Sequence, residues 1–477
     1  MPEKYNFSFI TAIAAIAAMG GFLFGFDEAV ISGTVDRVSS QFRLDVMTSG
    51  WFVSSALLGA IIGVIVGGNL SDRYGRKSTM ICSGALFAVS MIGCAMAPSF
   101  IYLVVYRLIG GIGIGVASIV CPMYISEIAV AKRRGLLVSL YQLAVTIGVV
   151  GAYLSNKWLL GIAMNGDNGF SGMLHYLFVD EWWRGMLGIG VVPSVVFLIS
   201  VFFIPESPRW LVLRGRLDKA KDVFSRIYGN DETAVKHQID ATLEVTRTNG
   251  TSGYAALLRP GILRAVLIGV AIAMLGQFMG VNAVLYYGPS IFKDAGLSDG
   301  DAFFYQVLVG AANMLTTIAA MFIIDKVGRK TLIYYGVSGM IISLLLIGAY
   351  FTWGAEMGIS HVFLLIFFLL YIICCAGSIC AVIFVILSEM YPLAVRGAAM
   401  SVAGLALWVA TFLVGQLTPW MLHTLSPAGT FLLFAIMCVP YMLIMWKLVP
   451  ETTGKSLEEI ERFWMNDELS DVTTEKA

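Results

Sequence analysis

The stretch DRYGRK at residues 72–77 decides the fold, because a close copy, DKVGRK, stands at residues 325–330. Each copy follows one long apolar run and precedes another, so each occupies a short polar loop between two apolar segments. The second copy lies about half the chain length after the first, which indicates an internal repeat of roughly 250 residues. The chain is therefore expected to fold as two related halves.

Two further pairs of charged motifs recur at matching places. In each half a glutamate stands seven residues before an Arg-Gly pair, and a proline–glutamate pair closes the half. A duplicated membrane bundle with matching loop charges is typical of transporters whose two halves rock about a central site. The recurring residues are Glu127 and Arg134 in the first half, Glu389 and Arg396 in the second, and the proline–glutamate pairs at 205–206 and 450–451.

The composition is that of a membrane protein. Of 477 residues, 58% are hydrophobic and 13% are charged. A soluble domain cannot bury that much apolar surface, whereas uncharged runs of about 20 residues fit membrane-spanning helices. The formal net charge is zero, which gives no reason to expect nucleic acid as a partner. The seven cysteines lack the spacing of a metal site, and we expect no cofactor.

The apolar runs predict twelve spans, and therefore an all-α membrane protein with two six-helix halves. Lys and Arg concentrate in the termini and in alternate loops, so the positive-inside rule places both termini in the cytoplasm. The predicted spans are 9–31, 49–70, 79–97, 101–126, 136–155, 184–204, 262–291, 302–324, 331–353, 361–388, 397–420 and 428–449.

The polar segments between and after the halves are predicted to carry short amphipathic helices. In the longest of them, Leu211, Val223 and Ile227 belong to an apolar pattern with helical spacing. The tail predicts one more helix at 455–465, where Ser456 is followed three residues later by a glutamate. The expected domains are the first half at 1–205, the cytoplasmic linker helices at 206–261, the second half at 262–450 and the cytoplasmic tail at 451–477.

These motifs resemble those of the sugar porter family of the major facilitator superfamily. The resemblance rests on PESPRWL at 205–211, PETTGKSLEEIE at 450–461, RLIGGIGIG at 107–115 and the paired D-x-x-G-R-K loops. The first span, GGFLFGFDEAVISG at 20–33, is similar to the bacterial proton-coupled branch, most of all to D-xylose:proton symporters. The resemblance implies the major facilitator fold and the import of a monosaccharide with a proton by alternating access.

The loop charges have a mechanical interpretation that the resemblance supports. Partly buried ion pairs at the cytoplasmic ends of the spans would hold that side closed when the pore opens outward. Glu127 and Glu389 are expected to face Arg134 and Arg396, respectively. The alternative is that these charges only fix the topology. The expected cytoplasmic gate comprises Asp72, Arg76, Glu127, Arg134, Glu206, Asp325, Arg329, Glu389, Arg396 and Glu451.

Asp27 and Arg107 are ionisable residues inside the apolar runs of spans 1 and 4. A charge in a membrane span is costly unless it is paired, so such residues are by default functional and face the bundle interior. In the family that the chain resembles, an aspartate at the position of Asp27 takes the proton and the arginine of span 4 is its partner. When the arginine moves away, desolvation favours the protonated carboxyl. The alternative is a static ion pair that holds the two spans together.

A sugar site needs amide side chains, which both donate and accept hydrogen bonds, and an aromatic face. Amides are scarce in the apolar spans, and Tyr286 lies one turn after Asn282 on the same face. Gly288-Pro289 interrupts span 7, as expected for a gating helix. The alternative for any single amide is a hydrogen bond between helices. The candidate substrate-binding residues are Phe24, Gln142, Gln277, Asn282, Tyr286, Asn313, Phe384 and Trp408.

The chain departs from the family pattern at several pocket positions. Gly276 stands where a first glutamine is usual in span 7, and Val149 stands where span 5 usually has a second. Phe384 and Leu407 lie where the pattern has a tryptophan and a glutamine. Each lost hydrogen bond to a buried hydroxyl weakens binding by roughly 1 kcal/mol. D-xylose, another pentose, a deoxy sugar, glucose and a cyclic polyol therefore all stay open as substrates.

Other functions fit the residues less well. An enzyme needs a nucleophile or metal cluster, and the four histidines lack ligand spacing, so the chain is not expected to be an enzyme. An uncoupled sugar facilitator is the main alternative, and Asp27 argues against it. A non-transporting sugar sensor and an exporter of other organic compounds are further alternatives. We expect a monomer in the bacterial inner membrane, in contact with lipid.

Overall fold

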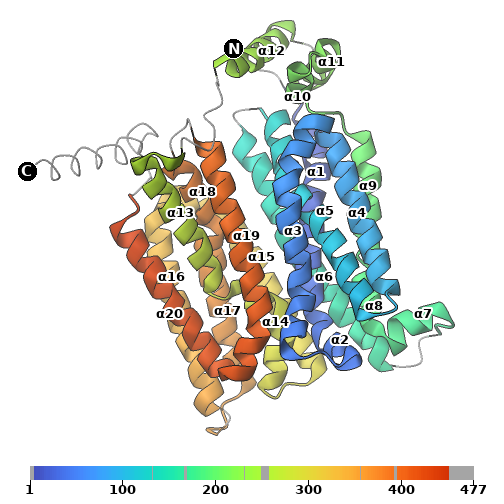
Figure 1. Cartoon of the computed structure of the whole chain (residues 1–477), viewed down its shortest axis with the longest axis vertical. Helices are drawn as coiled ribbons and strands as arrows, with labels where there is room; N and C mark the ends of the chain where they lie inside the picture. Colours follow the sequence, from blue (N-terminus) through green and yellow to red (C-terminus); the bar gives the residue numbers. More distant parts are fainter. Residues whose placement is uncertain are drawn as a thin grey trace, which may run out of the picture. The chain divides into compact units, whose positions relative to one another are not determined.

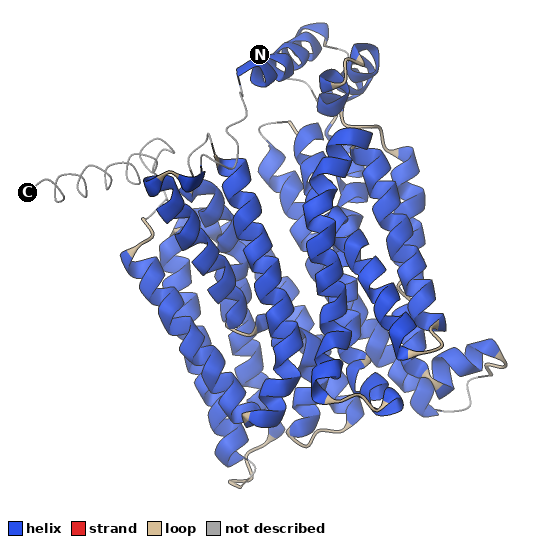
Figure 2. Cartoon of the chain, in the orientation of Figure 1, coloured by secondary structure: helices blue, strands red, loops and turns tan. Residues whose placement is uncertain are grey.

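The computed structural model describes residues 5–130, 133–165, 169–229, 231–248, 257–354, 356–391 and 395–450, and the regular elements in these ranges are helical (Figure 2). Within them, twelve helical segments are long and apolar enough to cross a membrane, one for each predicted span. They are Phe7–Gly33, Val46–Tyr74, Arg76–Met96, Phe100–Ile128, Arg134–Asn165, Trp182–Phe203, Pro260–Asp294, Asp299–Ile324, Arg329–Gly354, His361–Met390, Arg396–Thr424 and Ser426–Lys447.

The chain divides into two compact units. The first consists of Met1–Arg43 and Ser55–Gly250, and the second of Leu44–Ser54 and Thr251–Ala477. Helix α3 (Val46–Tyr74) therefore begins in the second unit and continues into the first. The other helices of the first unit are α1 (Phe7–Val30), α2 (Val35–Phe42), α4 (Arg76–Met96), α5 (Phe100–Ile128), α6 (Arg134–Asn165), α7 (Met173–His175), α8 (Trp182–Gly188), α9 (Val191–Phe203), α10 (Pro208–Leu213), α11 (Leu217–Tyr228) and α12 (Glu232–Thr248) (Figure 1).

The second unit repeats the pattern of long spans, two of which are broken in the middle. Span 7 is interrupted at Gly280, whose φ of +91° is the left-handed conformation that favours glycine. The interruption expected at Gly288-Pro289 was wrong, because α14 continues through both residues. Span 10 is interrupted at Ser378. The helices of this unit are α13 (Pro260–Phe278), α14 (Val281–Asp294), α15 (Asp299–Val327), α16 (Arg329–Ala349), α17 (His361–Gly377), α18 (Ile379–Met390), α19 (Arg396–Thr424) and α20 (Ser426–Lys447) (Figure 1).

The linker after span 6 folds into short helices, as its apolar pattern predicts. The Ser207 hydroxyl caps α10 by accepting a hydrogen bond from the Trp210 N–H, and Pro208 occupies the first turn. Helix α11 buries its apolar face and ends at Gly229, which has a positive φ. The Asn6 N–H donates to the Ile227 carbonyl at 2.8 Å, so the start of span 1 is fixed to α11. The helix expected at 455–465 lies outside the described residues.

Candidate functional site

The interior of the first unit contains the ion pair expected between spans 1 and 4. Arg107 Nη1 on α5 donates to Asp27 Oδ1 on α1 at 3.2 Å. The two side chains are only 3% and 4% exposed. In an apolar bundle each charge depends on the other to offset its loss of hydration. The predicted pairing is therefore present. It is a single buried contact between two spans, which a relative movement of the spans would break.

Glycines let the helices around this pair approach closely. A Cβ added at Gly25 would lie 1.9 Å from the Val145 carbonyl oxygen, so α1 packs backbone to backbone against α6. A Cβ at Gly111 would lie 2.0 Å from the Ala56 carbonyl oxygen, so α5 packs in the same way against α3. Close packing of small residues is how membrane helices associate. The Asp27 carboxylate is correspondingly shielded from water, with 4% of its side chain exposed.

The second unit contains a pair of amides that spans the break in span 7. Asn282 Nδ2, on α14, donates to Gln277 Oε1, on α13, at 2.8 Å. Gln277 is half-buried and Asn282 is buried. The bond joins the two half-helices across Gly280, while each amide keeps further donors and acceptors. A sugar hydroxyl could exchange with this bond, which makes the break a polar point in an apolar span.

The other sugar-site candidates lie in different surroundings. In the second unit, Tyr286 is fully buried on α14, while Asn313 on α15 and Trp408 on α19 are half-buried. Phe384 on α18 is 52% exposed. Phe24 and Gln142 belong to the first unit, where they are half-buried and exposed, respectively. The structure thus joins Gln277 to Asn282 by a hydrogen bond and places Tyr286 on the same half-helix as Asn282. The remaining candidates each lie on a different helix of their unit.

The charges predicted for the cytoplasmic end of the first unit form a network around Arg76. Its guanidinium donates to Glu127 at 2.8 Å and to Asp72 at 3.0 Å, with a further bond to the Ser71 carbonyl at 3.2 Å. The expected pairing of Glu127 with Arg134 was wrong, because the partner of Glu127 is Arg76 from the neighbouring loop. Asp72 lies one turn before Arg76 and is its second carboxylate partner.

Glu206 follows the last span of the first unit in sequence and caps the start of α4. Its carboxylate accepts hydrogen bonds from the Arg76, Lys77 and Ser207 N–H groups at 2.8–3.3 Å. Helix α4 needs such an acceptor because its first N–H groups have no helical partner. Burial raises the pKa of the Glu206 carboxyl, and the hydrogen bonds from Ser207, Lys77 and Arg76 only partly offset this rise. Glu206, from the proline–glutamate pair, is thus hydrogen-bonded to the backbone of the D-x-x-G-R-K loop.

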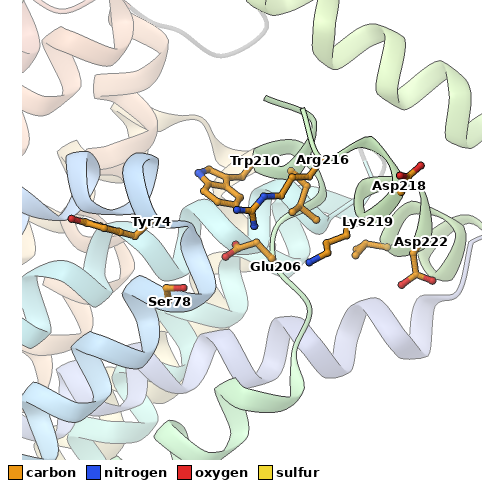
Figure 3. Close-up of a pocket in the computed structure, with 10 residues that line it drawn as sticks. Tyr74, Ser78, Glu206, Trp210, Arg216, Asp218, Lys219 and Asp222 are labelled. Carbon is orange, nitrogen blue, oxygen red and sulfur yellow. The ribbon is translucent and has the colours of Figure 1, made fainter. Parts of the chain in front are cut away.

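The same carboxylate borders a surface hollow of about 590 Å³ between the loop and the linker helices. Figure 3 shows Glu206 in the middle of this hollow, with Trp210 on one side and Lys219 on the other. The Trp210 indole N–H donates to the Asp72 carbonyl at 2.8 Å, which fixes α10 to the end of α3. The linker helices therefore belong mechanically to the first unit.

The second unit repeats the Arg–Glu contact of this arrangement. Arg329 Nη2 donates to Glu389 Oε1 at 3.2 Å. The expected contact between Glu389 and Arg396 was wrong, since Arg396 donates instead to the Tyr391 carbonyl at 3.3 Å. The side chain of Asp325 and the whole of Glu451 lie outside what the structure describes.

Sequence reasoning missed three amides that the structure shows in structural roles. Asn156 on α6 donates to the Val30 carbonyl at 3.0 Å, and Gln306 on α15 donates to the Val284 carbonyl at 3.2 Å. Gln416 on α19 donates to the Met47 carbonyl and accepts from the Ser54 hydroxyl, both in the second unit. The signal that singled out the sugar-site amides, a polar side chain in an apolar run, also marks these three.

Comparison with known proteins identifies the family. Residues 13–464 match the family described as sugar (and other) transporter. The chain belongs to this family. Two relatives are each 35% identical to the chain over 97% of both lengths: the arabinose-proton symporter of Bacillus subtilis and the D-xylose-proton symporter of Escherichia coli K12. The inward-open structure of the xylose transporter XylE from E. coli matches with a TM-score of 0.81 and 32% identity, covering 95% of this chain and 100% of that one.

Membership of the sugar (and other) transporter family confirms the resemblance drawn from the motifs. The twelve apolar helices and the similarity to XylE, a major facilitator superfamily protein, confirm the expected fold class. The chain is accordingly an integral membrane transporter and not an enzyme.

Proposed function

We propose that this chain imports a monosaccharide together with a proton by alternating access. The observation that carries the proposal is the Asp27–Arg107 pair, a 3.2 Å contact buried inside the first unit. A carrier that only let sugar diffuse down its gradient would have no use for an ionisable carboxylate at such cost. The relatives support the same function, because their names describe arabinose-, D-xylose- and galactose-proton symporters.

Coupling follows from what the pair does when it separates. In the proposed mechanism Asp27 is ionised while Arg107 contacts it at 3.2 Å, because the guanidinium offsets the carboxylate charge. If the arginine moves away, the carboxylate is left in an apolar interior, where binding a proton removes the uncompensated charge. The neutral carboxyl then no longer opposes the change of conformation. Asp27 is therefore the proposed proton acceptor, and Arg107 is the group that sets when it can accept.

The sugar is proposed to bind to the amides and aromatic side chains identified above. The Gln277–Asn282 bond across the span 7 break supplies exchangeable donors and acceptors next to Tyr286 on the same half-helix. Aromatic faces suit the apolar side of a sugar ring. The proposed substrate-binding residues are Phe24, Gln142, Gln277, Asn282, Tyr286, Asn313, Phe384 and Trp408.

The cytoplasmic ion pairs are proposed to serve as the gate. Arg76 with Glu127, and Arg329 with Glu389, join separate helices at distances that a small movement would break. The remaining proposed gate residues are Asp72, Arg134, Glu206, Asp325, Arg396 and Glu451. We place the two moving halves at 1–205 and 262–450, with the linker at 206–261, both termini and the tail 451–477 in the cytoplasm. The protein is proposed to act as a monomer in the bacterial inner membrane.

Counterflow in proteoliposomes tests the substrate. Vesicles loaded in turn with D-xylose, L-arabinose, D-galactose, D-glucose or myo-inositol would be diluted into a trace of labelled D-xylose or D-glucose. We expect transient uptake of label with one or two of these sugars. Counterflow needs no proton gradient, so it reports on the sugar site alone. Folded protein that gives no counterflow with any sugar of the panel would overturn the proposed substrate class.

An imposed gradient then separates the symporter from a facilitator. One proton crossing 100 mV gains about 2.3 kcal/mol, and one pH unit adds about 1.4 kcal/mol. The sum supports accumulation of a neutral sugar by up to roughly 500-fold. A facilitator would equilibrate the sugar without concentrating it, whatever the pH gradient.

A further inference from the structure

The outer half of span 7 contains a proline that alters its hydrogen bonding. Pro289 lies inside α14 and has no N–H, so it cannot donate to the carbonyl of Leu285 four residues earlier. Helices in membranes tolerate such prolines when a neighbouring helix supplies a donor. The helix that supplies this replacement donor is thereby attached to the half-helix α14.

In this chain the donor comes from span 8. Gln306 Nε2, on α15, donates to the Leu285 carbonyl at 3.4 Å and to the Val284 carbonyl at 3.2 Å. Gln306 is only 1% exposed. Its Oε1 atom is buried and has no hydrogen-bond partner among the described residues. The amide is thus committed to the backbone of α14 through its donor side alone.

A glycine makes this contact sterically feasible. A Cβ added at Gly288 would lie 1.8 Å from Gln306 Oε1 and 2.9 Å from Nε2. No side chain at position 288 is compatible with the amide in its observed place. The Gly288-Pro289 pair therefore does two things: the proline withholds a helical donor, and the glycine admits a replacement from α15.

Helix α14 has further polar attachments in its unit, among them the Lys293 ammonium, which pairs with Asp299 at the start of α15 at 2.7 Å. Asn282 bonds to Gln277 across the break, and the Tyr287 hydroxyl donates to the Gly415 carbonyl at 2.6 Å. The half-helix also carries Asn282 and Tyr286, which we propose to contact sugar. Any movement of α14 against α15 must break the two Gln306 bonds or carry the amide along.

We propose that Gln306 is a positioning residue that sets how readily α14 moves, and through α14 the rate at which sugar enters and leaves. The transport part of this inference rests on the proposed function; the attachment of α14 does not. Gln306 itself is not assigned a contact with sugar. Its role is to supply the donor that Pro289 lacks and to release it when the half-helix opens.

Hydrogen exchange of the purified protein without sugar tests the attachment. Gln306→Met keeps the length of the side chain but removes the donor. We expect the amides of 281–294 to exchange roughly 5- to 10-fold faster, as for the loss of one buried hydrogen bond, with 260–278 unchanged. Gly288→Ala should produce the same local increase by displacing the amide. Thr317→Val is the matched control, because Thr317 is buried on the same helix but donates only to Asn313 of that helix.

Sugar exchange tests the consequence. Gln306→Met should change the maximal counterflow rate by roughly threefold or more, while the equilibrium Kd for sugar stays within about twofold. Unchanged exchange of 281–294 in both variants would overturn the proposal, as would an equal increase throughout α13 and α14. An altered Kd with an unaltered rate would assign Gln306 to the sugar site instead. If wild-type protein exchanges no sugar, the proposed function fails, and the hydrogen-exchange result still decides the attachment.

Discussion

The two loop motifs have the same residue types at the same spacing, but their described Arg–Glu contacts differ in length and exposure. In the first unit, Arg76 and Glu127 are 7% and 13% exposed, and the arginine also bonds Asp72 and the Ser71 carbonyl. In the second unit, Arg329 and Glu389 are 14% and 23% exposed and share one contact at 3.2 Å. Glu389 Oε2 is buried without a hydrogen-bond partner among the described residues.

The difference shows that the motif fixes which groups can meet, while packing decides how strongly they are held. The turn itself is nearly identical, since Gly75 and Gly328 have φ values of +98° and +93°. The lysines that follow also bond alike, Lys77 to the Phe202 carbonyl and Lys330 to the Val449 carbonyl. If these Arg–Glu contacts serve as the proposed gate, the shorter, more buried one and the longer, more exposed one need not open together.

The largest expected effect separates the units by the charge in their interiors. The first unit has the Asp27–Arg107 ion pair in the interior of its spans, whereas the Lys293–Asp299 and Arg329–Glu389 pairs of the second unit lie at helix ends. Asp27→Asn should reduce proton-driven accumulation from up to roughly 500-fold to about onefold, because no carboxyl remains to carry the proton. Counterflow should persist, since sugar exchange needs no net proton movement.

The neighbouring acid supplies the control for this test. Glu28→Gln removes a carboxylate one position away on the same helix, and accumulation should survive. Accumulation of labelled sugar in vesicles with a pH gradient and a potential is the measurement. If Asp27→Asn still concentrates sugar, the proton is carried elsewhere and the interior of the first unit is only structural.

Next in size, matched substitutions should break the two Arg–Glu contacts unequally. Glu127→Gln leaves the Arg76 guanidinium buried with a weaker set of partners, at an expected cost of roughly 3 kcal/mol in the stability of the first unit. Glu389→Gln removes one longer and more exposed contact and should cost about 1 kcal/mol. Thermal unfolding of the two variants in the same detergent compares them directly. Equal shifts would mean that the two networks are equally strong and that the comparison of their contacts misleads.

The architecture followed from the sequence because each of its determinants is local. Every span is a long, predominantly apolar run, and in lipid such a run can satisfy its backbone hydrogen bonds only as a helix. The Asp27–Arg107 pair was also predictable, since two opposite charges inside one apolar bundle are stabilised by pairing with each other. The partner of Glu127 was not, because Arg134 is near in sequence whereas Arg76 arrives from another helix. The role of Gln306 is a similar case. The sequence shows that Pro289 lacks a backbone donor, but only the packing of α15 shows that the Gln306 side chain replaces it.

A smaller effect sharpens the comparison at the shared turn. An alanine at Gly75 or Gly328 must adopt a positive φ, which costs about 1–2 kcal/mol in either unit. At Gly75 the new Cβ would also lie 2.3 Å from Glu206 Oε2, so the cap on α4 must move. We therefore expect Gly75→Ala to lower the unfolding temperature more than Gly328→Ala. Equal losses would indicate that a cap of the same kind restricts the turn of the second unit.

The smallest expected effect concerns pH and the cap itself. Because burial raises the pKa of Glu206 above its ordinary value of 4.5, the native protein holds this proton more tightly than the unfolded chain does. Stability due to this group should therefore be greatest below pH 4.5 and fall as the pH rises through the native pKa. Glu206→Gln keeps an oxygen that can accept from the Arg76 and Lys77 N–H groups but removes the titration, so the variant should lose less stability than wild type between pH 4.5 and pH 8.

Melting curves over that range, with Glu232→Gln on α12 as an exposed control, measure the difference. A wild-type slope equal to that of Glu206→Gln would show that the hydrogen bonds to the cap fully offset its burial. In that case Glu206 would bind α4 equally well at every pH, and the folded first unit would owe no stability to the protonation of this cap. A steeper wild-type slope would instead mean that protonation of Glu206 at low pH stabilises the folded first unit. The second unit need not show the same pH dependence.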